Sequence, residues 1–243
     1  MKVSEKLYLD INGLMEHGPI NIVILGDSIS HGGMSDYIDY ENVYWNRLRK
    51  MLNQVRDYIP VNMINASIGG TCARQGVQRL ENGVLNHRPD LVIVCFGLND
   101  VNGPLQEFTD SLSEIFSRCQ EAGADVIYMT PNMLNTRVAE DTDERFVRYA
   151  RKTQEYQNEG RMDQYMQAAV ALAKRMGVPV CDCYARWKEL AKEQDITLLL
   201  FNRINHPAPE MHQLFAQALF EMILGKEAGE KKSESTMYAE EKE

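Results

Sequence analysis

Ile22–Ser28, with the sequence IVILGDS, is a short apolar run that ends abruptly in glycine, aspartate and serine. A continuous apolar run of this length is typical of a strand that is buried on both faces, as in a parallel sheet covered by helices. The carboxyl end of such a strand is where open α/β sheets place their chemistry. The sequence therefore predicts an α/β fold in which Ser28 stands at the functional edge of the sheet.

The rest of the chain alternates apolar runs with amphipathic segments. Further strands are expected at about 61–65, 91–96, 125–129 and 178–183. Helices are expected at 42–56, 73–80, from 104 onward, 162–176, 184–192 and 207–224. This alternation predicts parallel strands joined by crossover helices. With 243 residues and 44% hydrophobic content, the chain fits one domain over residues 1–225.

Two segments depart from this pattern. Residues 132–160 are longer than a typical connection and rich in charge, with an aromatic stripe at helical spacing. We interpret this insertion either as a solvated helix packed through the stripe, or as a lid or wall of the acyl pocket or a homodimer contact, because such connections border the site. Residues 226–243 are mostly charged and small polar residues, so disorder is expected there.

A serine hydroxyl is a weak nucleophile unless a base takes its proton and hydrogen-bond donors receive the oxyanion. Three later segments offer these groups. Asn65–Thr71 (NASIGGT) follows the second expected strand, Gly97–Asp100 (GLND) follows the third, and Asn205–Pro207 (NHP) precedes the last helix. The two glycine-bearing loops supply backbone N–H groups and an amide, and His206 supplies an imidazole. Together with Ser28 they provide a nucleophile, donors and a base.

In this order and context, the four segments resemble the conserved blocks of the SGNH or GDSL hydrolase family. The resemblance covers about residues 20–224. It implies a three-layer α/β/α sandwich, flavodoxin-like, with a five-stranded parallel sheet in the order 2-1-3-4-5. It also implies that Ser28 is the nucleophile and His206 the general base. The oxyanion hole would be formed by the N–H groups of Ser28 and Gly70 and by the side-chain amide of Asn99.

One position departs from the family pattern. The family usually carries an Asp three residues before the His, and here that position is Arg203. Such an Asp orients the imidazole, and its loss can cost on the order of 10⁴ in rate. The sequence leaves several replacements open: a backbone carbonyl near Arg203, the side-chain oxygen of Asn202 or Asn205, or a carboxylate of Asp195 or Asp182. Our hypothesis is a Ser-His dyad assisted by a neutral acceptor.

Other polar residues near these blocks have structural interpretations. His31 lies three residues after Ser28, a spacing that rarely returns a side chain to the nucleophile, so we interpret it as a loop residue that lines the pocket. Asp27 and Asp100 are interpreted as hydrogen-bonding groups that brace their loops, and His212 as a surface or helix-face residue of the last helix. No set of residues has metal-ligand spacing and no glycine pair fits a phosphate-binding fingerprint, so neither a metal nor another cofactor is expected.

The formal net charge of −9 argues against a nucleic acid or an anionic membrane as partner. Residues 1–18 lack the uninterrupted apolar run of a signal peptide. No segment approaches the roughly 20 apolar residues of a membrane span. A cytoplasmic location without stable membrane association is therefore expected.

The resemblance implies a serine esterase or acylhydrolase that cleaves small carboxylic esters through an acyl-enzyme. We expect the substrates to be short-chain or acetyl esters, such as those of acetylated carbohydrates, because no long apolar segment suggests a lipid interface. The alternatives are a lysophospholipase or thioesterase acting on lipids, and a catalytically weak relative that binds glycans or lipids, which Arg203 motivates. A doubly wound nucleotide-binding domain is supported only by the alternation of strands and helices.

Overall fold

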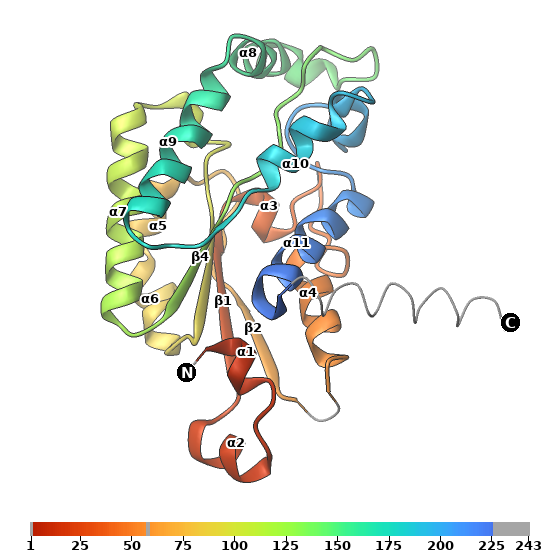
Figure 1. Ribbon diagram of the computed structural model, residues 1–243. Helices are drawn as coiled ribbons and strands as arrows, with labels where there is room; N and C mark the ends of the chain where they lie inside the picture. Colours follow the sequence, from red (N-terminus) through yellow and green to blue (C-terminus); the bar gives the residue numbers. More distant parts are fainter. Residues whose placement is uncertain (1, 57–58, 226–243) are drawn as a thin grey trace, which may run out of the picture.

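The computed structural model describes residues 2–56 and 59–225. Five parallel strands form one sheet in the order β2-β1-β3-β4-β5. They are β1 (Ile20–Gly26), β2 (Val61–Asn65), β3 (Leu91–Cys95), β4 (Asp125–Met129) and β5 (Val180–Cys181). Helices cover both faces of the sheet (Figure 1). The predicted three-layer fold and its strand order are confirmed, while the tail predicted at 226–243 lies outside the described residues.

Helices α5, α7 and α9 pack together on one face of the sheet, and α4 and α11 pack on the other (Figure 1). The helices of the described residues are α1 (Val3–Lys6), α2 (Ile11–His17), α3 (Ser28–His31), α4 (Tyr44–Asn53), α5 (Ala73–Gln78), α6 (Leu80–Gly83), α7 (Leu105–Glu121), α8 (Val147–Asn158), α9 (Arg161–Arg175), α10 (Cys183–Leu190) and α11 (His212–Leu224). Short 3-10 turns are η1 (Leu85–His87), η2 (Asp100–Asn102), η3 (Glu144–Phe146), η4 (Ile196–Leu199) and η5 (Pro209–Met211).

The two central strands explain the apolar runs of the sequence. All five residues of β3 are buried, and so are all residues of β1 except Asn21. A strand that is covered on both faces has no side chain facing water, so its sequence is continuously apolar instead of alternating. In register, Ile22–Gly26 pairs with Leu91–Cys95, which brings the carboxyl ends of the two strands to one edge.

Several element boundaries differ from the prediction. The fifth strand is only Val180–Cys181, because Asp182 caps α10 by accepting the N–H of Ala185 at 3.0 Å and the chain turns into the helix. The helix expected at 73–80 is divided into α5 and α6 at Arg79. His212, expected at the surface or on a helix face, is buried on α11, and its Nδ1 accepts the N–H of Tyr44 at the start of α4 at 3.2 Å.

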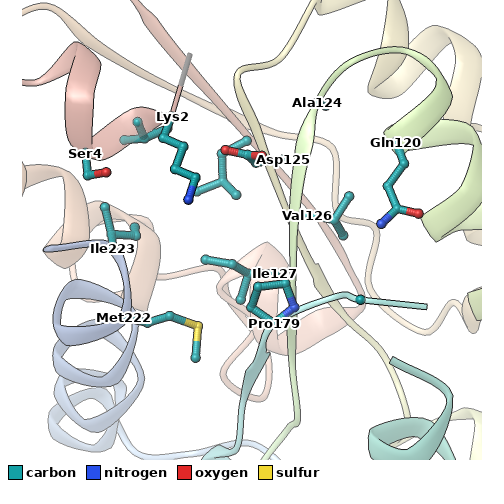
Figure 2. Close-up of a pocket in the computed structure, with 13 residues that line it drawn as sticks. Lys2, Ser4, Gln120, Ala124, Asp125, Val126, Ile127, Pro179, Met222 and Ile223 are labelled. Carbon is teal, nitrogen blue, oxygen red and sulfur yellow. The ribbon is translucent and has the colours of Figure 1, made fainter. Parts of the chain in front are cut away.

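A cavity of about 410 Å³ lies at the amino ends of β3 and β4, beside α1 and the end of α11 (Figure 2). Its lining includes Val3, Leu91, Asp125 and Ile223. This edge of the sheet is opposite to the one that carries Ser28. Within residues 2–56 and 59–225, no helix has the length and apolar character needed to cross a membrane.

Candidate active site

Ser28 is the first residue of α3 and directly follows the turn that ends β1. Asp27 caps this helix, because its Oδ1 accepts the N–H of Ile29 at 3.0 Å. Gly26 is required by space: a Cβ atom there would lie 2.4 Å from the Oγ of Ser30 and 2.7 Å from a backbone carbonyl of β3. Because Asp27 caps the helix, the hydroxyl of Ser28 is left for another partner.

That partner is His206. Its Nε2 lies 2.9 Å from the Oγ of Ser28, and its Nδ1 faces the backbone carbonyl of Met34. A carbonyl only accepts hydrogen bonds, so Nδ1 carries the ring hydrogen and Nε2 presents its lone pair to the serine hydroxyl. Burial lowers the pKa of His206 from its ordinary value of 6.5, and the hydrogen bond to Met34 opposes this shift in part. At neutral pH the ring is therefore uncharged and able to accept a proton.

The loop that carries His206 is closed by its own backbone. The N–H of Phe201 donates to the carbonyl of His206 at 2.7 Å. The side-chain oxygen of Asn202 accepts three consecutive backbone N–H groups, those of residues 204–206, each at 3.0 Å. Asn132, which follows β4, donates to the carbonyl of the residue before His206 at 2.9 Å. These bonds fix the position from which the imidazole reaches Ser28.

The side chains predicted to orient the imidazole have other partners. Asn202 holds the backbone of the loop and is not bonded to the ring. Asp182 caps α10 and accepts the hydroxyl of Thr130 at 2.9 Å. Asp195 caps η4 and pairs with Arg137 at 2.6 Å. These expectations are corrected: both carboxylates stand at helix starts, where backbone N–H groups engage them.

Arg203 also points away from the imidazole. Its backbone has a φ of 60°, and its guanidinium pairs with Asp141 at 2.9 Å and donates to the carbonyls of Leu198 and Leu200. The acceptor that faces His206 is a neutral carbonyl, as hypothesised. It belongs to Met34, however, and comes from the loop after α3 instead of from the surroundings of Arg203.

The expected oxyanion donors follow the carboxyl ends of β1, β2 and β3 at the same edge of the sheet, Ser28 at the start of α3 and the other two on loops. The N–H groups of Ser28 and Gly70 have no acceptor in the part of the chain that the structure describes. Gly70 has a φ of 76°, a left-handed conformation that favours glycine. Asn99 donates one amide hydrogen to the carbonyl of Thr71 at 2.9 Å, which ties the third loop to the second. An amide carries two hydrogens, so one remains for a ligand.

Two buried carboxylates brace these loops from behind. Asp100 accepts the N–H of Ala73, the first residue of α5, at 2.8 Å. Burial raises the pKa of Asp27 to about 7, with the charge of Asp100 adding to the shift, and burial raises the pKa of Asp100 to about 6. One oxygen of each carboxyl is buried without a hydrogen-bond partner. Both residues are structural, and burial stabilises the protonated form of each relative to a carboxyl group in water.

Arg79 is a structural residue of the site that sequence reasoning missed. Its guanidinium donates to the carbonyl of Gly26 at 2.8 Å, to the carbonyl of Ala66 at 3.2 Å and to the hydroxyl of Thr71 at 3.0 Å. It thereby joins the end of β1 to the loop after β2. The only sequence signal would be an arginine at a break between two helices, and arginines at such breaks are common whether or not a site is near.

His31, the histidine nearest to Ser28 in the sequence, is engaged elsewhere. Its Nδ1 accepts the N–H of Gly69 at 3.2 Å, and its Nε2 lies 3.3 Å from the hydroxyl of Tyr40. The imidazole therefore lies beside the loop after β2, and no hydrogen bond joins it to the serine hydroxyl.

The insertion at 132–160 reaches the loops around the site. Asp141 pairs with Arg203 in the loop of His206, and Arg145 lies 3.9 Å from Asp36 in the loop after α3. On α8, burial raises the pKa of Tyr149, and the side chain of Asn102, next to the third loop, opposes this shift. Figure 1 shows α8 above the carboxyl edge of the sheet. These contacts favour the interpretation of the insertion as a wall of the site.

A second cavity lies next to the oxyanion donors. It has a volume of about 260 Å³, and its lining includes Cys72, Asn99, Asn102, Glu107 and Phe108. Among the residues that the structure describes, no group of three or more His, Cys, Asp or Glu side chains is placed to hold a metal ion.

Comparison with known proteins agrees with the geometry. The sequence model of the GDSL-like lipase/acylhydrolase family matches residues 24–214. The chain belongs to this family. The match includes the expected site residues of all four sequence blocks, from Ser28 to His206, so the resemblance found in the sequence is confirmed.

This GDSL-family chain also resembles individual proteins. An arylesterase of Vibrio mimicus is 34% identical over 112 residues, 44% of this chain and 52% of that protein. The uncharacterized lipoprotein YqeF of Bacillus subtilis is 26% identical over 127 residues, 49% of this chain and 51% of that protein. The matches thus span about half the length of these curated relatives.

Among solved structures, an acetylxylan esterase, Axe2 of Geobacillus stearothermophilus, has a TM-score of 0.67 at 21% identity. The likeness covers 84% of this chain and 94% of that chain. At this identity the likeness establishes a shared fold.

Proposed function

We propose that this GDSL-family chain is a serine esterase that cleaves short-chain or acetyl esters of small molecules through an acyl-enzyme. The decisive observation is the distance of 2.9 Å between Nε2 of His206 and Oγ of Ser28, in a ring whose tautomer the carbonyl of Met34 fixes. Nucleophile and base are within hydrogen-bond reach, and the base is oriented by a third group.

The reaction follows from these positions. Ser28 Oγ attacks the acyl carbon while its proton moves to Nε2 of His206, and the carbonyl oxygen becomes an oxyanion. The N–H groups of Ser28 and Gly70 and the free amide hydrogen of Asn99 receive that charge. When the tetrahedral intermediate collapses, His206 returns the proton to the departing alcohol. Water, deprotonated by the same imidazole, then attacks the acyl carbon of the acyl-enzyme. The bond to Oγ of Ser28 breaks, His206 returns the proton to Oγ, and the acyl group leaves as a carboxylic acid.

A carbonyl is an adequate substitute for the usual Asp in one respect. In Ser-His-Asp enzymes, exchanging the Asp for Asn lowers kcat about 10⁴-fold because the imidazole then adopts the wrong tautomer. The carbonyl of Met34 accepts only, so it enforces the productive tautomer of His206. It lacks a full negative charge, so it stabilises the imidazolium less than a carboxylate does.

The surroundings of Asn99, one of the expected oxyanion donors, support a small substrate. The cavity beside Asn99 is modest in volume, and its lining mixes polar Asn102 and Glu107 with apolar Phe108. Such a lining suits a short acyl or a polar alcohol group better than a long alkyl chain. The names of two similar proteins, an arylesterase and an acetylxylan esterase, support the same class.

The test is hydrolysis of p-nitrophenyl acetate, butyrate and octanoate by the purified chain and by its Ser28→Ala and His206→Ala variants. Ser35→Ala and His87→Ala, both at exposed positions, serve as matched controls. We expect turnover to fall by at least about 10⁴-fold in the two site variants and to stay unchanged in the controls. The rate should decrease from acetate to octanoate.

Three outcomes would contradict the proposal. Activity that survives Ser28→Ala would remove the serine from the reaction. A rate that rises with acyl length would favour a lipid acylhydrolase. A parent protein that neither hydrolyses these esters nor reacts with a fluorophosphonate probe would favour a binding role.

A further inference from the structure

We infer that His31 is a positioning residue of the oxyanion hole, holding the Gly69-Gly70 segment so that the N–H of Gly70 faces the acyl oxygen. This inference rests on the proposed esterase function. It gives a role in the reaction to a histidine that neither attacks the substrate nor takes the serine proton.

The first observation is the shared helix. Ser28 is the first residue of α3 and His31 is the last, so the nucleophile and the imidazole of His31 are parts of one rigid turn. Nδ1 of His31 accepts the N–H of Gly69 at 3.2 Å. Gly69 lies directly beside the nucleophile, because a Cβ atom there would be 3.7 Å from Cβ of Ser28 and 3.7 Å from Nδ1 of His31. The helix therefore carries the nucleophile and also the anchor of the loop.

The second observation concerns the other hydrogen bonds that hold the loop after β2. Its far end is fixed at Thr71, whose carbonyl accepts the amide of Asn99 at 2.9 Å and whose hydroxyl bonds to Arg79 and to the carbonyl of Ile68. The two glycines in between have no side chain to pack. Two successive glycines have large conformational freedom, which folding must remove. The bond to His31 is the one hydrogen bond that holds the N–H of Gly69 among the residues that the structure describes.

The third observation concerns the state of the imidazole. A backbone N–H only donates, so Nδ1 of His31 must be unprotonated and Nε2 must carry the hydrogen. The hydroxyl of Tyr40 lies 3.3 Å from Nε2 and provides the acceptor for it. The N–H of Gly69 thus selects this neutral tautomer, and the hydroxyl of Tyr40, which can accept as well as donate, is compatible with it. A neutral ring with both nitrogens engaged serves as a support for the loop.

A specific kinetic signature follows. The N–H of Gly70 bonds most strongly to the oxyanion, which exists only during the reaction, so its correct placement changes kcat more than KM. Removal of one oxyanion donor costs about 10²- to 10³-fold in kcat. Loosening a donor without removing it should cost less, about 10- to 100-fold.

The test compares His31→Leu, which has no acceptor, with His31→Asn, whose side-chain oxygen can take the place of Nδ1. His87→Leu is the matched control, since His87 is exposed at the opposite edge of the sheet. With p-nitrophenyl acetate we expect kcat to fall about 10- to 100-fold in His31→Leu with KM within about twofold. His31→Asn should recover kcat to within about threefold of the parent.

Results that contradict the role of His31 can be told apart from results that contradict the esterase function. An active parent whose kcat is unchanged in His31→Leu would show that the loop needs no anchor. Equal loss in His31→Leu and His31→Asn, or a change in KM alone, would show that the acceptor is not the cause. If His31→Leu does not fold, His31→Ala replaces it with the same expectations. A parent that is itself inactive and unlabelled by fluorophosphonate would instead refute the proposed function.

Discussion

Asp27→Asn is expected to abolish a large pH dependence of stability. Burial raises the pKa of Asp27 from 3.8 to about 7, so between these values the native state keeps a proton that the unfolded chain has released. Stability therefore falls as pH rises through this window. A shift of about 3 units corresponds to about 4 kcal/mol. Asn keeps the shape and an oxygen for the N–H of Ile29, but it carries no charge at any pH.

The assay is urea unfolding of the parent and of Asp27→Asn at pH 4.5 and pH 8. The variant loses some stability at both values, since its buried amide N–H groups lack acceptors, but this cost is the same at each pH. From pH 4.5 to pH 8, the free energy of unfolding of the variant should gain about 3 kcal/mol relative to that of the parent. This gain is smaller than about 4 kcal/mol because the parent has already lost part of its stability at pH 4.5. Asp110→Asn, at an exposed helix position, should show no such gain. A gain below about 1 kcal/mol would refute a buried, protonated Asp27.

Three further predictions concern the base, its alternatives and the arginine behind the site. Because burial lowers the pKa of His206, kcat/KM should fall as pH decreases through a value below 6.5, and a pH–rate profile with an acid limb above 6.5 would contradict this. Asp182→Ala and Asp195→Ala should retain ester hydrolysis within about threefold, since neither carboxylate bonds to the imidazole; loss of turnover in a folded variant would restore a triad. Arg79→Met should lower the free energy of unfolding by about 2–3 kcal/mol in urea titrations, because it leaves carbonyls without donors; a change below about 0.5 kcal/mol would show that water replaces the guanidinium.

The parts of the fold that the sequence predicts well are those with burial on two faces. β1 and β3 appear as continuous apolar runs because helices cover both sides of each. β5 is the opposite case: its expected apolar run was longer than the strand, because a helix cap at Asp182 ends the extended backbone. The burial of His212 was not predicted for a related reason: a histidine on a helix face is compatible with both a solvent-exposed and a buried position.

The residues of the candidate site also differ in how well the sequence predicts them. Ser28, Gly70, Asn99 and His206 could be singled out because each is a distinctive residue type after a strand or before a helix. The carbonyl of Met34 could not, since every residue has a carbonyl and no residue type signals its use. Sequence patterns therefore indicate which side chains gather at an edge, while the choice of a main-chain partner depends on the three-dimensional path of a loop.

The main-chain oxygen at position 34 has a consequence for how this GDSL-family protein can change. No side-chain exchange at Met34 deletes that oxygen, so a complete substitution scan would find two essential polar positions and overlook the third participant. Its placement depends on backbone bonds within the loop, from Met34 N–H to the carbonyl of Tyr37 at 3.0 Å and from Asp39 N–H to that of Gly32 at 2.8 Å. Insertions and deletions in this loop, more than point mutations, are therefore the changes through which evolution or engineering could retune the base.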